Sequence, residues 1–206
     1  MGYRLSKGRS LSLSEIAPGV RRFLVDVGRT GPSAPLCPSD AHAFVVGHHG
    51  YSLSPEYVLS PGRPSAPDGC LRRATGAGGD GGPDGPDRRD GAAVFDVDLP
   101  ALPGIAQSVY FAMSVDVPAG RTTAAHCGIS GAYVQLRDGD ARRALARYDL
   151  DEDVSTETAM LLAELYRRAG QWRFRPLGQG YTTGWPGIAA RYRSATGPEP
   201  LAGECS

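Results

Sequence analysis

The fold is decided by residues 145–190, which read LARYDLDEDVSTETAMLLAELYRRAGQWRFRPLGQGYTTGWPGIAA. The apolar residues of 157–169 cover more than half of a helical wheel, and such a wide apolar stripe favours a buried helix. Ser155 or Thr156 can cap its start, because a hydroxyl accepts a hydrogen bond from an unsatisfied backbone N–H. Gly170 can end it in the left-handed conformation. We therefore predict a principal helix over residues 157–169.

The rest of the chain predicts strands. Trp172 and Phe174 alternate with two arginines, which indicates a half-buried strand that Pro176 ends or places at a sheet edge, and a turn and a short helix follow before Ala190. Period-two patterns or β-branched and aromatic runs predict further strands over residues 10–16, 21–27, 40–46, 56–59, 92–99, 108–115, 131–136 and 144–150. Turns are predicted at residues 18–19, 48–50, 98–103 and 138–140. Many short strands with one principal helix indicate a mainly β fold: a two-sheet β-sandwich with one α-helix packed against it.

Composition limits the class of protein. The 206 residues carry 22 lysines and arginines and 22 aspartates and glutamates, so the formal net charge is zero. Nucleic-acid binding needs a basic surplus, so we predict no nucleic-acid partner. No window approaches ~18 apolar residues and the start lacks a signal-peptide pattern, so we predict no direct membrane insertion. Four cysteines without a C-x-x-C pair favour a reducing, cytoplasmic location.

We assign one domain to residues 1–193 and a loose C-terminal tail to residues 194–206. Within the domain, residues 60–91 are rich in glycine, proline and aspartate, which predicts a flexible loop. Residues 70–73 are its one candidate for a brief strand.

The quoted stretch closely resembles the C-terminal half of TerD-type tellurium-resistance and stress proteins. The ordered run Y-D-L, S-T-E-T-A-M, E-L-Y-R-R, W-R-F and G-Q-G-Y carries the resemblance, and residues 5–19 (LSKGRSLSLSEIAPG) resemble the first strand and turn of that family. The resemblance implies a compact two-sheet β-sandwich in a bacterial cytoplasmic protein. It also implies a non-enzymatic role in tellurite or envelope stress. The implied partners are other proteins of the same stress system, with a membrane protein of that system as one candidate.

The resemblance further implies calcium binding through three acidic segments, and this chain departs from each of them. Residues 28–30 read G-R-T where the family has tryptophan and aspartate, and residues 38–44 keep the second aspartate of the family's D-L-D run, as Asp40, but lose the first. Residues 74–91 replace the third segment and offer Asp80, Asp84, Asp87 and Asp90. Ca²⁺ needs six to eight oxygen ligands, and clustered aspartates on loops can supply them.

The metal-ligand candidates are therefore Asp40, Asp80, Asp84 and Asp87. Two arginines, at positions 88 and 89, lie among the loop aspartates, and the spacing is not that of an EF-hand. The sequence leaves two interpretations open: a calcium site, or a solvated polar loop in a protein that has lost calcium binding.

Two other groups contain side chains that bind metals or act as nucleophiles. Cys37, His42, His48 and His49 could bind a transition metal, but their spacing fits no standard zinc pattern, and a half-buried structural His42 is the favoured interpretation. The pair His126-Cys127 could carry thiol chemistry, but neighbours in an extended chain point to opposite faces, which favours a buried thiol.

The C-terminal half is rich in arginine. Arg147, Arg167, Arg168, Arg173 and Arg175 could bind an acidic partner or phosphate, or could cover apolar surface with their stems. Residues 76–85 are glycine-rich but lack the Lys-Ser/Thr pair of a P-loop. We therefore expect a non-enzymatic TerD-like stress protein with Ca²⁺ as its candidate ion. The alternative is a degenerate, metal-independent scaffold that binds partners through these arginines, and an enzyme that uses Cys127 or a histidine site is the remote third.

Overall fold

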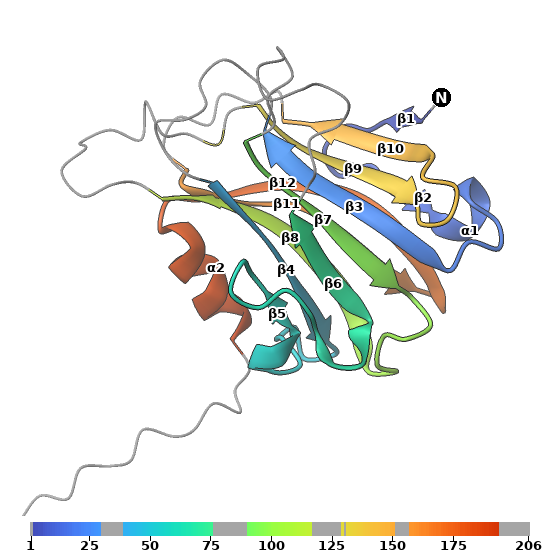
Figure 1. The fold of residues 1–206 in the computed structure, drawn as a ribbon, viewed down its shortest axis with the longest axis horizontal. Coiled ribbons are helices and arrows are strands. Elements are labelled where there is room, and N and C mark those ends of the chain that lie inside the picture. Colours follow the sequence, from blue (N-terminus) through green and yellow to red (C-terminus); the bar gives the residue numbers. More distant parts are fainter. Residues whose placement is uncertain are drawn as a thin grey trace, which may run out of the picture.

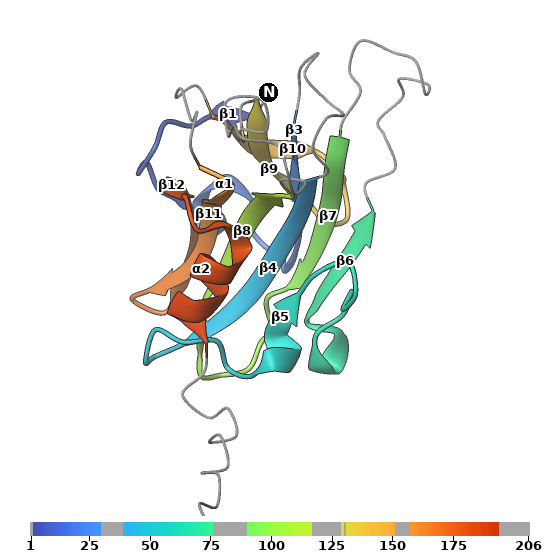
Figure 2. The same cartoon turned by 90° about the vertical axis from the view of Figure 1, so that its left-hand side faces the viewer.

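The computed structural model describes residues 2–29, 39–75, 90–116, 129, 131–150 and 157–193. Two six-stranded sheets form two layers (Figure 1, Figure 2). In spatial order the first sheet contains β1 (Tyr3–Arg4), β10 (Ala144–Asp149), β9 (Ala132–Asp138), β3 (Arg22–Arg29), β7 (Asp90–Asp98) and β6 (Leu71–Thr75). The second contains β2 (Leu11–Ser12), β12 (Gln171–Tyr181), β11 (Ala159–Arg168), β8 (Ala106–Val115), β4 (Ser39–Gly47) and β5 (Val58–Leu59). The helices are α1 (Leu13–Ile16), η1 (Pro55–Tyr57), η2 (Pro67–Gly69) and α2 (Gly184–Tyr192).

The main hydrophobic core lies between the two sheets. β3 points Phe23, Val25 and Val27 into it, every second residue, as the side-chain alternation of a strand requires. Phe95 of β7 and Phe111 of β8 meet across the interface with ring centroids 5.6 Å apart. The predicted mainly β, two-sheet sandwich with one principal helix is confirmed.

The prediction of a helix over residues 157–169 is wrong, because this stretch forms β11 in the middle of the second sheet. β11 pairs antiparallel with β12 on one side and with β8 on the other. Met160 and Leu165 belong to the core between the sheets, whereas Ala159 and Leu161 belong to a second cluster beneath α2. A strand buried on both faces reads as a continuous apolar run, which periodicity alone cannot distinguish from a buried helix.

A β-bulge in β11 adds to the helix-like appearance of this stretch. Against β8, the pairing register shifts between Leu161 and Ala163, which pair with the adjacent residues Ala112 and Phe111, so Leu162 is the extra residue of the bulge. Against β12 the register shifts at the same point, but there the extra residue lies on β12, because Leu161 pairs with Gln179 and Ala163 with Pro176. Leu162, Ala163 and Leu165 consequently all belong to the inner core. Inward residues three positions apart are typical of a helix, and here the bulge produces that spacing in a strand.

The predicted first strand over residues 10–16 is also partly wrong, because only Leu11–Ser12 is extended and α1 follows at once. Leu13 and Ala17 are both buried in the core, and the backbone N–H of Ala17 donates to the carbonyl of Leu13 at 2.9 Å. This four-residue spacing is that of one helical turn. The predicted turn at residues 18–19 is present, with Gly19 at a φ of 79°.

The other predicted strands are present, and two of them differ notably in length from the prediction. β5 keeps only Val58–Leu59 of its predicted segment. β12 does not end at Pro176 but continues to Tyr181. On one side, β12 pairs with β2, but only at Arg173 and Phe174. Pro176 therefore has no β2 residue opposite it on that side of β12. This is the edge position that a residue without a backbone N–H can occupy.

Aspartate side chains stabilise two of the predicted turns. Asp98 Oδ1 accepts a hydrogen bond from the N–H of Ala101 at 3.3 Å. Asp138 Oδ1 accepts from the N–H groups of Asp140 and Ala141, at 2.9 and 3.0 Å, at the turn between β9 and β10. Short aspartate side chains stabilise turns in this way because they satisfy backbone donors that the strands leave open.

Part of the predicted loop over residues 60–91 forms regular structure. The brief strand predicted at residues 70–73 is confirmed as β6, which pairs antiparallel with β7. Ser60 and Arg63 exchange backbone hydrogen bonds, and the N–H of Ala66 donates to the carbonyl of Leu71 at 2.9 Å. Residues 76–89 and the predicted tail over 194–206 lie outside the described residues. The domain bounds stay a prediction.

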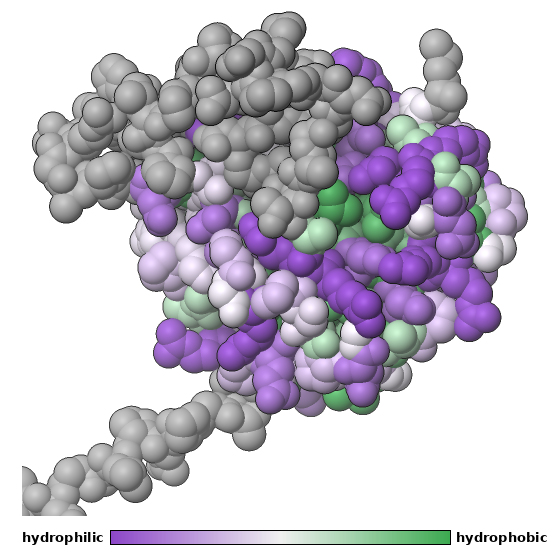
Figure 3. All heavy atoms as spheres, viewed as in Figure 1, coloured by the Kyte–Doolittle hydropathy of each residue, from purple (hydrophilic) through white to green (hydrophobic). Residues whose placement is uncertain are grey.

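The outer faces of the two sheets differ. Hydrophilic side chains gather over β3, β9 and β10 on the outer face of the first sheet (Figure 3). The outer face of the second sheet is covered in part by α2 (Figure 2). Ile188 of α2 belongs to one buried hydrophobic cluster with Phe44 and Leu161. The principal helix of the fold is therefore α2, the short helix predicted before Ala190.

Candidate functional site

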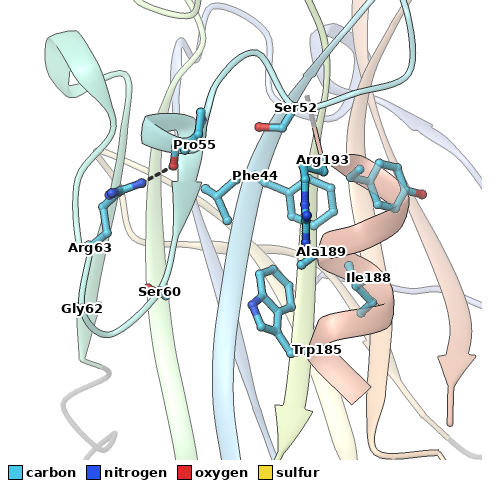
Figure 4. Close-up of a pocket in the computed structure, with 12 residues that line it drawn as sticks. Phe44, Ser52, Pro55, Ser60, Gly62, Arg63, Trp185, Ile188, Ala189 and Arg193 are labelled. Carbon is cyan, nitrogen blue, oxygen red and sulfur yellow. Dashed lines mark hydrogen bonds between the residues drawn. The ribbon is translucent and has the colours of Figure 1, made fainter. Parts of the chain in front are cut away.

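A groove with a volume of about 530 Å³ lies between α2 and the edge of the second sheet at β4 and β5 (Figure 4). Phe44 lines it from β4, and Val58 lines it from β5. Four residues of α2 complete the wall: Trp185, Ile188, Ala189 and Tyr192. These four have the i, i+3, i+4, i+7 spacing of one helix face, so α2 presents an apolar and aromatic surface to the groove.

The C-terminal end of α2 is tied to the segment that follows β4. The N–H of Ser52 donates to the carbonyl of Tyr192 at 2.8 Å, which satisfies one of the open carbonyls at a helix end. Ser54 then caps η1, because its hydroxyl accepts from the N–H of Glu56 at 3.3 Å. The first contact links the two walls of the groove, and the second stabilises the wall that follows β4.

Aromatic rings form the floor between these walls. Phe44 is fully buried, and its ring centroid lies 4.9 Å from that of Tyr192 and 5.3 Å from that of Tyr110. Trp185 meets Phe44 edge-on at 6.2 Å. Such separations are those of stabilising ring pairs. Burial raises the pKa of Tyr110, and the neighbouring carboxylate of Glu164 raises it further.

His42 lies beside this aromatic cluster. Its ring stacks on the indole of Trp185 with centroids 3.8 Å apart and planes at 9°. Its Nε2 is 2.9 Å from the hydroxyl oxygen of Ser114, and its buried Nδ1 has no hydrogen-bond partner among the described residues. Burial lowers the pKa of His42 to about 4, and the charge of Arg73 lowers it as well. The imidazole is therefore neutral at physiological pH, and its face supports the indole of Trp185.

Two arginines flank the groove. Arg63 enters from the segment after β5 and Arg193 from the residue after α2, and both are exposed (Figure 4). A guanidinium N–H of Arg63 donates to the carbonyl oxygen of Pro55. Within the described part of the chain, neither arginine forms an ion pair, and no aspartate or glutamate lines the groove.

Of the four predicted metal ligands, the structure describes one. Asp40 lies near the start of β4, half-buried, opposite Ser114 of β8. Its carboxylate lies near Arg73, whose pKa is lowered by burial, an effect that the charge of Asp40 offsets only in part. Asp80, Asp84 and Asp87 lie outside the described residues.

The ends of several strands meet at the same end of the sandwich as Asp40 (Figure 1). β3 ends there at Arg29, which pairs with Asp90 at the start of β7 and with Ala132 at the start of β9. Ser114 pairs with both Asp40 and Ala159, so β4, β8 and β11 share this end too. Among the described residues, no group of three or more histidines, cysteines, aspartates and glutamates is close enough to hold a metal ion. These residues alone therefore do not make a calcium site.

The predicted cysteine and histidine group is not brought together in the part that the structure describes. His42 is buried beside Trp185, whereas His48 and His49 are exposed in the turn after β4, and Cys37 lies outside the described residues. His126 and Cys127 lie outside them too.

The arginines of the C-terminal half are divided between the two sheets. Arg147 is on β10 of the first sheet, where it pairs with Asp149 at 2.6 Å and stacks on Tyr133. The others are on β11 and β12 of the second sheet, where Arg173 donates to the hydroxyl of Ser10 at 2.8 Å and Arg175 pairs with Glu164. They do not form one stripe, because the two sheets face opposite ways.

Comparison with known proteins decides the family. The family model described as the TerD domain matches residues 1–192 of the chain. The chain belongs to the TerD family.

Two curated relatives extend this result. The tellurium resistance protein TerD of Serratia marcescens is 35% identical over 202 residues, which is 93% of this chain and 97% of the relative. General stress protein 16U of Bacillus subtilis is 29% identical over 200 residues, again 93% of this chain and 97% of the relative. The solved structure of a TerD homologue from Streptomyces coelicolor A3(2) matches 84% of this chain and 96% of that one, with a TM-score of 0.57 and 22% identity, which shows the shared fold.

Sequence reasoning missed the groove of this TerD-family protein. Its residues come from β4, from the segment 52–63 and from α2, and neither the segment nor the helix carries a recognised motif. One signal was available: Trp185, Ile188 and Tyr192 have the i, i+3, i+7 spacing of one helix face, although the predicted short helix stops before Tyr192.

In the described residues, no helix is long and apolar enough to cross a membrane.

Proposed function

We propose that this TerD-family protein is a non-enzymatic stress-response protein that acts in tellurite or envelope stress by binding partner proteins of the same stress system. The observation that carries the proposal is the match, along nearly the whole length of both chains, to a tellurium resistance protein and to a general stress protein. The proposal includes a cytoplasmic location, a membrane protein of the same system among the partners, and no nucleic acid.

The groove supports a binding role over a catalytic one. Acid–base or nucleophilic catalysis needs a pair of positioned reactive groups, such as an imidazole beside a thiol or a carboxylate. Aromatic and aliphatic side chains make up most of the lining, and the ionisable groups among the lining residues are Arg63, Arg193 and the phenol of Tyr192.

Deletion of the gene in the bacterium that encodes it tests the role. We expect the deletion strain to tolerate less tellurite or less envelope-damaging agent, and the wild-type gene to restore tolerance. Because the proposed role is non-enzymatic, a gene with Cys127→Ser and His126→Ala should restore tolerance equally well. Unchanged tolerance of the deletion strain, or a failure of this double variant to complement, would contradict the proposal.

We further propose that Ca²⁺ binds at the end of the sandwich that carries Asp40. What supports this is connectivity: β6 ends at Thr75 and β7 begins at Asp90, so the segment with Asp80, Asp84 and Asp87 leaves and returns at the strand ends near Asp40. Oxygen-rich side chains on loops are the usual calcium ligands. The positive charge of Arg73 next to Asp40 opposes this binding.

Thermal unfolding of chelator-stripped protein, with calcium added in steps and magnesium as the control ion, tests the calcium proposal. A ligand that binds only the native state and is present at 100 times its Kd adds about 2.7 kcal/mol of stability. For a domain of this size that raises the Tm by roughly 5–10 °C. The rise should be lost in a variant with all four ligands changed: Asp40→Asn, Asp80→Asn, Asp84→Asn and Asp87→Asn.

A matched variant with Glu15→Gln, Glu56→Gln and Asp140→Asn removes exposed carboxylates elsewhere and should keep the calcium response. No change in Tm up to millimolar calcium would rule out the site. The stress role would then rest on the metal-independent scaffold, with its partner surface in the arginine-rich C-terminal half.

A further inference from the structure

We propose that the groove between α2 and β4–β5 is a binding site for a small amphipathic anion: a planar aromatic body that carries one carboxylate. This inference goes beyond the stress-response and calcium proposals and does not depend on either. It rests on the volume, the lining and the charges of the groove.

The volume fits a small molecule. Sites for small ligands are concave, mostly apolar, and about 300–1,000 Å³ in volume. The groove measures about 530 Å³, and the side chains that line it are mainly apolar and aromatic. Phe44 and Ile188 lie buried beneath it, whereas Val58, Trp185 and Ala189 are partly exposed, so a ring system of naphthalene size would bury apolar surface that these three leave open to water. Figure 4 shows Trp185 and Ala189 on the α2 side of the groove.

The aromatic lining favours a planar ligand body. Trp185 is held in place by its stack on His42, and Tyr192 by its contacts with Phe44 and Tyr110. Rings that are already fixed lose little conformational freedom when a flat molecule packs against them, so the binding cost is low. Offset or edge-on contact with such rings is favourable in its own right.

The charges favour an anion. Arg63 and Arg193 stand on opposite walls, one after β5 and one after α2, and both are lining residues. No carboxylate of the described chain is among the lining residues, so the charged groups that line the groove are both cationic, which favours an anion over a cation. A carboxylate at the edge of the bound ring would be within the reach of two guanidinium groups, which bind carboxylates through directional, charge-assisted hydrogen bonds.

NMR titration of the full chain with three probes of one shape tests the proposal: 2-naphthoate, the neutral 2-naphthylmethanol and the cationic 2-naphthylmethylammonium. The chain has two tryptophans, and Trp172 is not a lining residue. The indole N–H signal of Trp185 should therefore shift on titration while that of Trp172 stays in place. We expect 2-naphthoate to bind at least about fivefold more tightly than the alcohol, and the ammonium probe to bind most weakly.

Two variants separate charge from shape. The joint change of Arg63→Gln and Arg193→Gln should lower the affinity for 2-naphthoate about fivefold, to that of the alcohol, and leave the alcohol unaffected. Arg168→Gln, an exposed arginine on β11, is the matched control and should change neither affinity. Ala189→Phe places a ring in the groove and should abolish binding of all three probes, with the rest of the spectrum showing an intact fold.

Three results would overturn the proposal: equal affinity for the three probes, a shift of both tryptophan signals, or no shift of Trp185 at millimolar 2-naphthoate. Equal affinities in particular would leave an apolar groove without charge selection, as expected of a surface that docks a peptide side chain. None of these results bears on tolerance to tellurite or on the calcium-dependent Tm, so the stress-response and calcium proposals stand or fall separately.

Discussion

The outer faces of the two sheets meet water in different ways. On the first sheet, ion pairs join neighbouring strands, Asp26 with Arg137 and Arg22 with Asp96, and a further pair lies within β10. On the second sheet, the equivalent face carries Phe44, Val46 and Leu161 beneath α2, with aromatic rings at the margin and an ion pair between Arg175 of β12 and Glu164 of β11. Both faces belong to the same sandwich and share one core between them.

The difference shows where a β-sandwich of this kind can acquire a binding site. Long side chains reach their diagonal neighbours on adjacent strands, so arginines and aspartates on a sheet face pair with each other. Side chains that are paired in this way are not available to bind a ligand. On the second sheet, the part of the outer face beneath α2 is apolar. The helix does not extend over this face as far as the edge strand β5. The groove is what remains between the helix and the edge strand. Substitutions on each face can test whether the two contribute to stability as differently as their chemistry suggests.

The largest effect is expected at Phe44, which is buried in the aromatic cluster of the second sheet. Phe44→Ala should lower the free energy of unfolding by about 4 kcal/mol, because it removes the ring and leaves a cavity under α2. Urea denaturation followed by circular dichroism measures the loss. Gln135→Ala, at a partly exposed position on the outer face of the first sheet, is the control and should cost less than about 1 kcal/mol. A similar loss in both variants would contradict the proposed difference between the faces.

The second effect depends on pH and belongs to His42. Its pKa is about 4 in the folded protein, against an ordinary value of 6.5 for an exposed histidine, so the unfolded chain binds the proton more readily. The stability due to a neutral His42 is complete above pH 6.5 and is lost as the pH falls towards 4. Linkage gives a loss of about 2 kcal/mol by pH 5 and about 3 kcal/mol by pH 4.

Urea denaturation between pH 7.5 and pH 5 measures this loss, with His42→Gln as the test variant. Glutamine can still bond the hydroxyl of Ser114 but does not titrate, so the variant should be less stable at pH 7.5 and lose about 2 kcal/mol less than the wild type on acidification. His49→Gln changes an exposed histidine and should keep the wild-type slope. Equal slopes in wild type and His42→Gln would show that His42 is not the group responsible.

Much of the sheet architecture could be predicted from sequence, because a half-exposed strand shows its period of two. β7 is an example, with Phe95 and Val97 inward and Asp96 outward. β11 could not be predicted, because its two faces are both buried and its bulge at Leu162 breaks the alternation. Good helix formers such as alanine, methionine and leucine in a buried central strand are a case of tertiary packing overriding local propensity.

The candidate site was less accessible to sequence reasoning. The groove brings together residues as far apart in sequence as Phe44, Arg63 and Trp185. No local sequence pattern indicates that α2 folds back over β4. Asp40 was identified through a family segment rather than through geometry. Its proximity to Arg73 depends on the contact between β4 and the edge of the other sheet, which a linear pattern does not contain.

Among the ion pairs of the first sheet, the loss of the Asp26–Arg137 pair should lower the free energy of unfolding most. Arg137 binds Asp26 through two parallel hydrogen bonds of 2.6 and 2.5 Å. The side chain of Arg137 is only 20% exposed and that of Asp26 only 11%. Asp26→Asn should cost about 2 kcal/mol, because it leaves a poorly solvated guanidinium without its counter-charge. A double-mutant cycle with Arg137→Gln should give a coupling of about 1–2 kcal/mol, and a coupling near zero would contradict the assignment.

The smallest change in the free energy of unfolding is expected for the Arg22–Asp96 pair, which has similar geometry but is more exposed to solvent. Arg22 also binds Asp96 through two nitrogens, with Nε 2.6 Å from Oδ1, but its side chain is 51% exposed. Solvent screens such a pair and its side chains give up rotamer freedom to form it, so Arg22→Gln should cost less than about 0.5 kcal/mol. The residual effect should fade in 1 M salt, whereas that of Asp26→Asn should persist. A cost at Arg22 equal to that at Asp26 would mean that bidentate geometry, rather than burial, decides how strongly the charged face contributes to stability.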